Sequence, residues 1–200
     1  MDHLRFSGKT DAEQQDALET IIRKTPLLME VLQGMREIDL PDWWIVSGAI
    51  YNTVWNHLTN RPSETGIKDI DVIYFDDSDL SYEAEDRQIS LVDEMFKDAT
   101  IPIELRNQAR VHLWYFKKFG RPYAPLTSAL ESLQKYASKT HAVAIRLEAG
   151  DQMTIHAPFG LDYIFSFQMA PNHGAENQAT HEEKGARAKS VWPELEILSW

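Results

Sequence analysis

Two aspartates separated by a single residue, Asp69 and Asp71, stand in the run 68–75, which is otherwise rich in β-branched and aromatic residues. If this run is a β-strand, side chains two apart project from the same face, so Ile70 and Val72 point into a core while both carboxylates lie together on the other face. Neighbouring carboxylates repel unless a cation lies between them, and such oxygen ligands suit Mg²⁺. The spacing predicts a site for Mg²⁺, or for Mn²⁺.

A third acidic residue, Glu104, lies in another short run predicted to be a strand, 101–106. Its apolar neighbours are expected to point into the core, so Glu104 should face away from it together with Arg106. Carboxylates on neighbouring strands can hold two Mg²⁺ ions, about 3.5–4 Å apart, which place the attacking and leaving oxygens of a phosphoryl transfer in line. We therefore predict metal-binding and catalytic roles for Glu104 and the two aspartates.

The pair Ser47 and Gly48 follows a short apolar run, 43–46, and precedes a pattern of helical spacing, 49–58. Small residues at a strand-to-helix turn let backbone N–H groups approach a phosphate closely, and the helix N-terminus favours negative charge. We predict that this turn holds a nucleoside triphosphate. Lys68, directly before the aspartates, is predicted to balance their charge or contact the same phosphates.

Asn107 and Arg110 follow Glu104 at a predicted junction between strand and helix. One interpretation is that they bind a phosphate or a base of the nucleotide from the same side of the helix. The other is that Asn107 caps the helix and Arg110 pairs with an acidic side chain of the protein. The residues alone favour neither interpretation.

Ser47-Gly48, the pair Asp69-x-Asp71 and the later Glu104 together resemble the signature of the nucleotidyltransferase superfamily, which shares the polymerase-β-like fold. Further segments resemble a bacterial branch of nucleotidyltransferase-like proteins of unassigned substrate: 52–55, 106–114, 157–162 and 192–195. The resemblance runs from about residue 43 to residue 200. It departs from the superfamily in the 20 residues between Gly48 and Asp69, because the loop 60–68 is long.

Other acidic and basic groups have simpler interpretations. The carboxylates of Asp76, Asp77 and Asp79 form an acidic turn that lacks the glycine and the distal glutamate of a calcium loop. The basic stretch 184–189 fits a solvated helix face better than a phosphate site. Asp69 and Asp71 themselves have the alternative of lying on the exposed face of an edge strand, without any metal.

The composition limits the cellular setting and the partners. With no cysteine, the chain forms no disulfide and no thiolate metal site. It shows no signal peptide and no apolar stretch long enough for a bilayer, so we expect a cytoplasmic protein without a membrane partner. The net charge of −11 argues against a nucleic-acid polymer as partner, unless the 20 Lys and Arg residues gather on one surface.

The order of predicted helices and strands indicates an α+β fold: a nucleotidyltransferase-like mixed β-sheet flanked by helices. We expect residues 1–200 to form a single domain, with N-terminal helices in 1–40, the core sheet and its helices in 41–160, and C-terminal helices and a tail in 161–200. Within these parts, 127–136 and 160–169 are predicted to be helical, and 141–156 a β-hairpin.

The resemblance implies an enzyme, a nucleotidyltransferase that uses Mg²⁺ to move a nucleoside monophosphate from a nucleoside triphosphate such as ATP to an acceptor hydroxyl. Two alternatives stay open: a catalytically inactive nucleotide-binding module of the same fold, and a metal-dependent phosphohydrolase in which water attacks. The sequence leaves the acceptor, the base preference and the oligomeric state open.

Overall fold

The computed structural model describes residues 2–174 and 176–200. Its α-helices are α1 (Asp11–Arg23), α2 (Pro26–Ile38), α3 (Gly48–Thr59), α4 (Tyr82–Met95), α5 (Val111–Phe119), α6 (Asp162–Phe165) and α7 (Gln178–Val191). Its strands are β1 (Trp44–Val46), β2 (Ile70–Tyr74), β3 (Ile103–Asn107), β4 (Ala144–Leu147), β5 (Met153–His156), β6 (Gln168–Met169) and β7 (Glu196–Ile197). Short 3₁₀ helices are η1 (Gln108–Arg110), η2 (Leu130–Lys135) and η3 (Lys139–His141).

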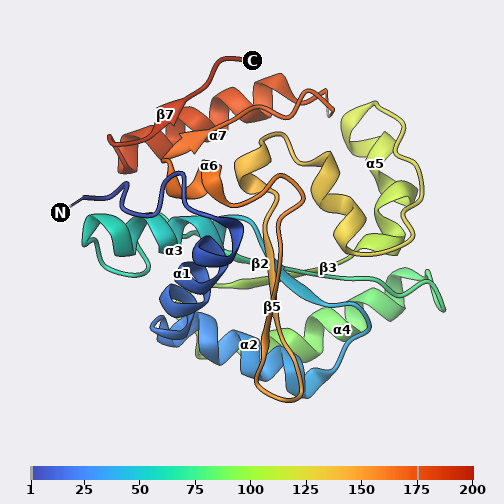
Figure 1. The fold of residues 1–200 in the computed structure, drawn as a ribbon. Coiled ribbons are helices and arrows are strands. Elements are labelled where there is room, and N and C mark those ends of the chain that lie inside the picture. Colours follow the sequence, from blue (N-terminus) through green and yellow to red (C-terminus); the bar gives the residue numbers. More distant parts are fainter. Residues whose placement is uncertain (1, 175) are drawn as a thin grey trace.

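The main sheet has five strands in the order β3-β2-β1-β4-β5. Strands β2 and β3 are parallel, whereas β1 pairs antiparallel with both β2 and β4, and β4 pairs antiparallel with β5. The crossover between the parallel strands is the helix α4 (Figure 1). This mixed sheet with flanking helices confirms the predicted α+β class, and the antiparallel β4–β5 pair confirms the predicted hairpin.

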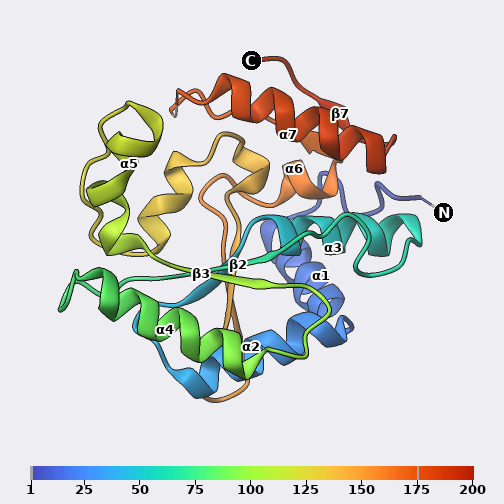
Figure 2. The ribbon, with the colours of Figure 1, turned by 180° about the vertical axis from the view of Figure 1, so that it is seen from behind.

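The two faces of the sheet are covered unequally. Ile45, Val72, Leu105 and Ile145 belong to the main core, which also includes residues of α1–α4, α6 and α7. The strand residues that alternate with them meet a smaller apolar cluster around Leu133 of η2. Figures 1 and 2 show α2 and α4 on one side of the sheet and α5 with η2 on the other. The predicted carboxylates stand on the side with the smaller cluster, where the sheet is less completely covered.

Local sequence signals account for most helix ends. Thr10 and Glu13 form a capping box at the start of α1, and Pro26 is the first residue of α2, where a missing N–H costs nothing. The Ser81 side chain caps α4. Gly120 ends α5 in the left-handed conformation, with φ 69°, which glycine adopts without strain.

Two predicted helices in the second half of the chain were wrong in extent. Of the segment 160–169, only α6 is helical, because Phe167 takes a positive φ of 52° and the next residues, β6, pair in parallel with β7. The segment 127–136 forms the 3₁₀ helix η2, which ends with a hydrogen bond from the Tyr136 N–H to the Leu133 carbonyl. The apolar spacing within 160–169 does not reveal the pairing of β6 with β7, and the spacing within 127–136 does not distinguish a 3₁₀ helix from an α-helix.

The C-terminal segment is joined to the core by a buried tryptophan. The Trp192 ring packs against Trp55 of α3, and its Nε1–H donates to the Asn56 side chain at 3.0 Å. Strand β7 then continues from this anchor to β6. None of the described helices is long and apolar enough to cross a bilayer.

Candidate active site

The sheet brings the predicted acids together from two neighbouring strands. Asp71 of β2 and Glu104 of β3 are directly paired in the parallel register, so their side chains leave the same face of the sheet. Asp69 directly precedes β2 and lies two residues before Asp71. Because side chains alternate along a strand, all three carboxylates lie on the same face of the sheet, opposite the main core.

Asp71 lies in the centre of this negative group and is half-buried. Burial, the largest effect, and the nearby Asp69 carboxylate raise the pKa of Asp71 to about 6. The Glu104 carboxylate raises this pKa further, while Lys184 and Arg106 partly offset the effect. The ionised form of Asp71 is thus disfavoured, as expected for a carboxylate that would be stabilised by a bound cation.

The donor set fits a hard divalent cation chemically, because all three predicted ligands supply carboxylate oxygens. The side chains are not gathered around a common point, however. No group of three or more His, Asp or Glu side chains among residues 2–174 and 176–200 lies close enough together to hold a metal ion. The exposed Glu104 carboxylate instead faces Arg106 at 3.4 Å, so a metal would compete with this ion pair.

The turn Ser47-Gly48 lies at the end of β1, next to the acids. Val46 is paired with Asp71 across the antiparallel β1–β2 register, so the following turn lies beside the start of β2. Ser47 adopts φ 60° and ψ −119°, a backbone conformation that side chains disfavour and that is often found at functional sites. The turn opens into α3, whose first amide groups carry partial positive charge.

Space is left on the outer side of this turn. A Cβ added at Gly48 would lie 3.8 Å from the Tyr51 hydroxyl and 4.0 Å from the Asn52 side-chain nitrogen, both ordinary contact distances. The Asn52 Oδ1 atom is buried, and no donor within the described residues reaches it. A buried acceptor without a donor is costly, which suggests that a ligand or water supplies one.

Two cations that the sequence assigned to a solvated helix face lie near the site, one close to Asp71 and the other close to Tyr51. Lys184 and Arg187 project from α7 and act electrostatically on Asp71 and on Tyr51, respectively. Both are exposed, and no hydrogen bond or ion pair joins the ammonium or guanidinium group of either residue to a described side chain. The predicted solvated helix face therefore borders the acids. Lys68, the residue before Asp69, is exposed.

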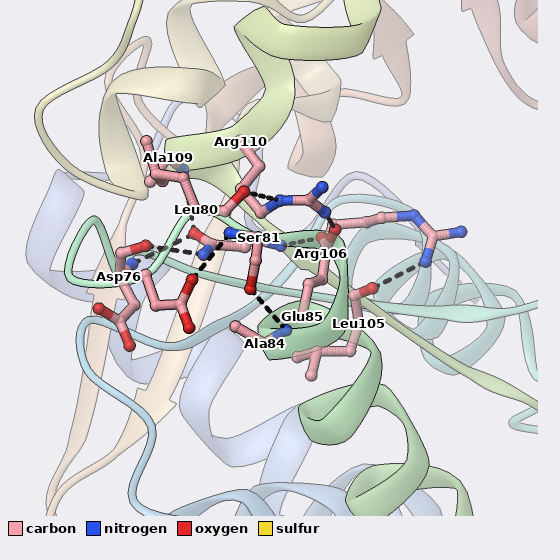
Figure 3. A network of polar contacts seen from close by, with 11 residues as sticks. Asp76, Leu80, Ser81, Ala84, Glu85, Leu105, Arg106, Ala109 and Arg110 are labelled. Carbon is pink, nitrogen blue, oxygen red and sulfur yellow. Dashed lines mark hydrogen bonds and ion pairs between the residues drawn. The ribbon is translucent and has the colours of Figure 1, made fainter.

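Asn107 and Arg110 lie elsewhere, in a network of hydrogen bonds between β3, η1, α4 and the loop 76–81. Figure 3 shows Arg110 within this network. The Arg110 guanidinium pairs with the buried Glu85 carboxylate and donates to the Leu80 carbonyl at 2.9 Å. Asn107 accepts from the Ala109 N–H and exchanges hydrogen bonds with the backbone of Asp76. Their role in nucleotide binding stays a prediction, and the contacts shown here serve the fold.

A cavity of about 260 Å³ adjoins the acids on the β3 side. Its floor includes Asp71, Glu104 and Arg106. Its walls come from α5, the loop after α5 and η2, and they include Trp114, Tyr115, Ser132, Lys135, Tyr123 and Tyr136. The turn Ser47-Gly48 follows β1 on one flank of β2, and the cavity extends over β2 toward β3 on the other flank, with Asp71 and Glu104 in its lining.

The profile of a family described as nucleotidyltransferase matches residues 33–197, so the chain belongs to this family. A solved structure, described as an NMR structure that reveals a CCA-adding enzyme head domain, is similar with a TM-score of 0.74 and 29% identity. The match covers 93% of this chain and 96% of that one. No functionally curated protein matches the sequence.

The predicted superfamily resemblance, fold class and assignment to the transferases are thereby confirmed. The roles of the individual site residues stay predictions. Lys184 and Arg187 were assigned to a solvated helix face and not to the site, because they lie 80 or more residues after the acids in the sequence. Their spacing of three residues on one predicted helix was the available signal, since such residues share a face.

Proposed function

We propose that the protein transfers a nucleoside monophosphate from a nucleoside triphosphate to an acceptor hydroxyl, with Mg²⁺ or Mn²⁺ as cofactor. The observation that carries this proposal is the register pairing of Asp71 with Glu104, with Asp69 two residues away on the same face. Membership of the nucleotidyltransferase family and the similarity to a CCA-adding enzyme head domain support the reaction class.

In this reaction the acceptor oxygen attacks the α-phosphorus and forms a new P–O bond. The bond between the α-phosphorus and the oxygen that bridges to the β-phosphate breaks, and pyrophosphate leaves with the bonding electrons. Glu104 accepts the proton of the acceptor hydroxyl, because it is the exposed carboxylate beside the cavity. Asp69 and Asp71, with Glu104, would hold the metal, which neutralises charge on the phosphates.

The triphosphate is proposed to lie on the β1 side of the acids. Ser47 and Gly48 would hold it through the open turn and the N-terminus of α3. Lys184 and Arg187 would meet its outer phosphates, since both are exposed cations without a partner among the described side chains. Lys68 is a further candidate for phosphate contact. The buried Asn52 Oδ1 is available for a donor of the nucleotide.

The proposal is tested by offering triphosphates labelled at the α-phosphate together with Mg²⁺ or Mn²⁺ and a cell extract. We expect label transfer and pyrophosphate release by the wild-type protein and neither by the double variant Asp69→Asn/Asp71→Asn. The matched control Asp76→Asn/Asp77→Asn removes the same charge from the loop 76–81, which contacts Asn107 and Arg110 and not the proposed metal ligands. This control should keep the activity. Label transfer that survives in the Asp69/Asp71 variant would refute these roles.

One observation favours a second candidate, a nucleotide-binding module without turnover. The three carboxylates are not gathered into a metal site, and Glu104 is paired with Arg106. Calorimetry separates the two cases: nucleotide binding that is independent of metal and yields no pyrophosphate indicates the module. Release of inorganic phosphate in place of pyrophosphate would instead indicate a phosphohydrolase.

A further inference from the structure

The charge of the chain is reversed in the segment that forms the wall of the cavity. Residues 111–136, here called the α5–η2 lobe, contain the four cations Lys117, Lys118, Arg121 and Lys135 but only one acid, Glu131. The whole chain has a net charge of −11. The argument against a nucleic-acid polymer concerns the surface as a whole, and it does not hold for this lobe, which borders the acids.

The same lobe presents a group of aromatic rings. Tyr115 contacts Tyr123 and Phe119, with ring centroids 4.6 Å and 4.7 Å apart. Phe119 is 50% exposed and Phe116 is 65% exposed, and the Lys118 ammonium lies 5.3 Å from the Phe119 ring. Exposed rings next to cations are what a single strand of nucleic acid requires, because its bases stack on rings and its phosphates meet the cations.

Two cavities follow one another along this lobe. The first contains Asp71 and Glu104, and the second is lined in part by Arg121 and Pro122. They share the lining residues Tyr115, Tyr123 and Lys135, and each has a volume of about 260 Å³. A pair of adjoining cavities of equal size, which starts at the proposed catalytic base, suits a ligand made of repeating units better than a single small molecule.

We propose that the acceptor is the 3′ end of a single-stranded polynucleotide. Its terminal nucleotide occupies the first cavity with the 3′-hydroxyl toward Glu104, and the preceding nucleotide occupies the second. The inference rests on the proposed function, since the 3′-oxygen is the atom that forms the new bond to the α-phosphorus, pyrophosphate leaves, and Glu104 takes the proton. Phe116, Lys117 and Lys118 contact the strand further from its end.

Binding is tested first, because it needs no turnover. Fluorescein-labelled RNA and DNA 12-mers of one sequence are titrated with the full chain, and fluorescence anisotropy is followed from low to physiological salt. We expect both single strands to bind more tightly than a duplex of the same sequence. Each lost phosphate contact lowers the slope of log affinity against log salt by about 0.7. Lys117→Ala/Lys118→Ala should therefore reduce the slope by roughly 1.4.

Two variants complete the binding test. Phe116→Ala should weaken single-strand binding about tenfold, as expected for the loss of one stacked base. Lys9→Ala/Lys97→Ala removes two exposed lysines of the N-terminal segment and of the end of α4, and should leave both affinity and slope unchanged. Absence of single-strand binding at low salt, or a duplex that binds equally well, would overturn the proposal.

Transfer is then measured with three acceptors: the 12-mers with a free 3′-hydroxyl, the same 12-mers with a 3′-phosphate, and the small-molecule filtrate of a cell extract. We expect the label only on the strands with a free hydroxyl, and the RNA and DNA arms show which polymer is used. Label in the filtrate but not on any strand refutes the acceptor while the proposed function stands. Label nowhere, with the strands still bound, refutes the proposed function and leaves the lobe a binding surface without transfer.

Discussion

At the scale of single residues, the site is governed by the cost of keeping Asp71 charged. Its carboxylate is half-buried next to two others, and its pKa is raised from 3.8 to about 6. Because an unfolded chain ionises this group more easily, the ionised Asp71 destabilises the folded state at any pH above about 6. The destabilisation fades as pH falls from 6 toward 4 and both states become protonated.

The substitution Asp71→Asn should therefore stabilise the metal-free protein. At pH 8 we expect the free energy of unfolding in urea to rise by about 3 kcal/mol, since the pKa is raised from 3.8 to about 6 and each pKa unit corresponds to roughly 1.4 kcal/mol. At pH 4 the gain should disappear. Asp77→Asn, at an exposed position, serves as the control with no gain at either pH. A gain that does not depend on pH would contradict this account.

Substitutions at two glycines are expected to distinguish an effect on triphosphate binding from an effect on folding. Gly48→Ala should leave the free energy of unfolding unchanged or slightly raised, because the added Cβ meets only ordinary contacts, while it weakens nucleoside triphosphate binding by filling the open turn. Gly66→Ala should leave little folded protein, because its φ is 73° and the added Cβ would lie 2.4 Å from the Trp192 ring. Calorimetric titration and urea unfolding measure the two effects, and unchanged affinity in the Gly48 variant would exclude the turn as the phosphate site.

What the sequence could predict at this scale follows from strand alternation. The shared face of Asp69 and Asp71 needs only a period of two, and the place of Glu104 needs only the assumption that its strand is adjacent to theirs. The cations of α7 could not be predicted to lie there, because no local pattern says which surface a helix near the C-terminus will cover. The partner of Arg110 was equally hidden, since Glu85 lies in another helix.

At the scale of elements, the Glu85–Arg110 pair fixes α4 against the end of β3. The pair is buried, and Glu85 also accepts from the Asn107 N–H at 2.8 Å. Arg110→Met alone should destabilise the protein by about 3–5 kcal/mol, because it leaves the Glu85 charge buried without a partner. The double variant Glu85→Gln/Arg110→Met keeps an oxygen for Asn107 and should recover most of that loss in urea unfolding.

The same double variant decides between the two interpretations of Arg110. If the guanidinium serves only the fold, nucleoside triphosphate affinity measured by calorimetry should equal that of the wild-type protein. If it contacts the nucleotide, the affinity should fall although stability is recovered. The contacts shown in Figure 3 lead us to expect the first result.

The cations proposed to bind phosphate and the cation that stabilises the fold occupy different positions on helix α7. Lys184→Ala and Arg187→Ala should each weaken triphosphate binding about tenfold, the effect of losing one charge-assisted hydrogen bond. Lys189, in contrast, donates to the carbonyls of Pro193 and Leu195, so Lys189→Ala should lower the melting temperature without changing the affinity. Calorimetry and thermal unfolding check the three variants together. An equal loss of affinity in all three variants would indicate that the positive charge of α7 attracts the triphosphate without specific contacts.

Elements whose ends depend on local chemistry were predictable, and those that depend on distant pairing were not. The cap of α4 by Ser81 and the stop of α5 at Gly120 can be read from the residue types alone. The parallel pairing of β6 with β7 joins Gln168 to Glu196, and two residues in each strand give too short a pattern to be recognised.

At the scale of the whole molecule, one core joins the N-terminal, central and C-terminal parts of the chain. The main core runs from Ala17 of α1 through the sheet to Leu195, and Trp192 is buried against α3. No part of this core closes without the others, since both ends of the chain contribute fully buried side chains to it. We therefore expect residues 1–200 to unfold as a single cooperative domain.

Urea unfolding followed by tryptophan fluorescence and by far-UV circular dichroism tests this expectation. Fluorescence reports on the six tryptophans, among them Trp55 and Trp192, which link α3 to the C-terminal segment. Dichroism averages over all helices, so coincident midpoints by the two methods indicate one transition. A fragment of residues 1–160 should fail to fold, because it lacks the buried Phe165, Phe167 and Trp192. Two separate transitions, or a folded fragment, would show that the C-terminal part, with the proposed phosphate-binding cations of α7, folds independently of the part that carries the acids.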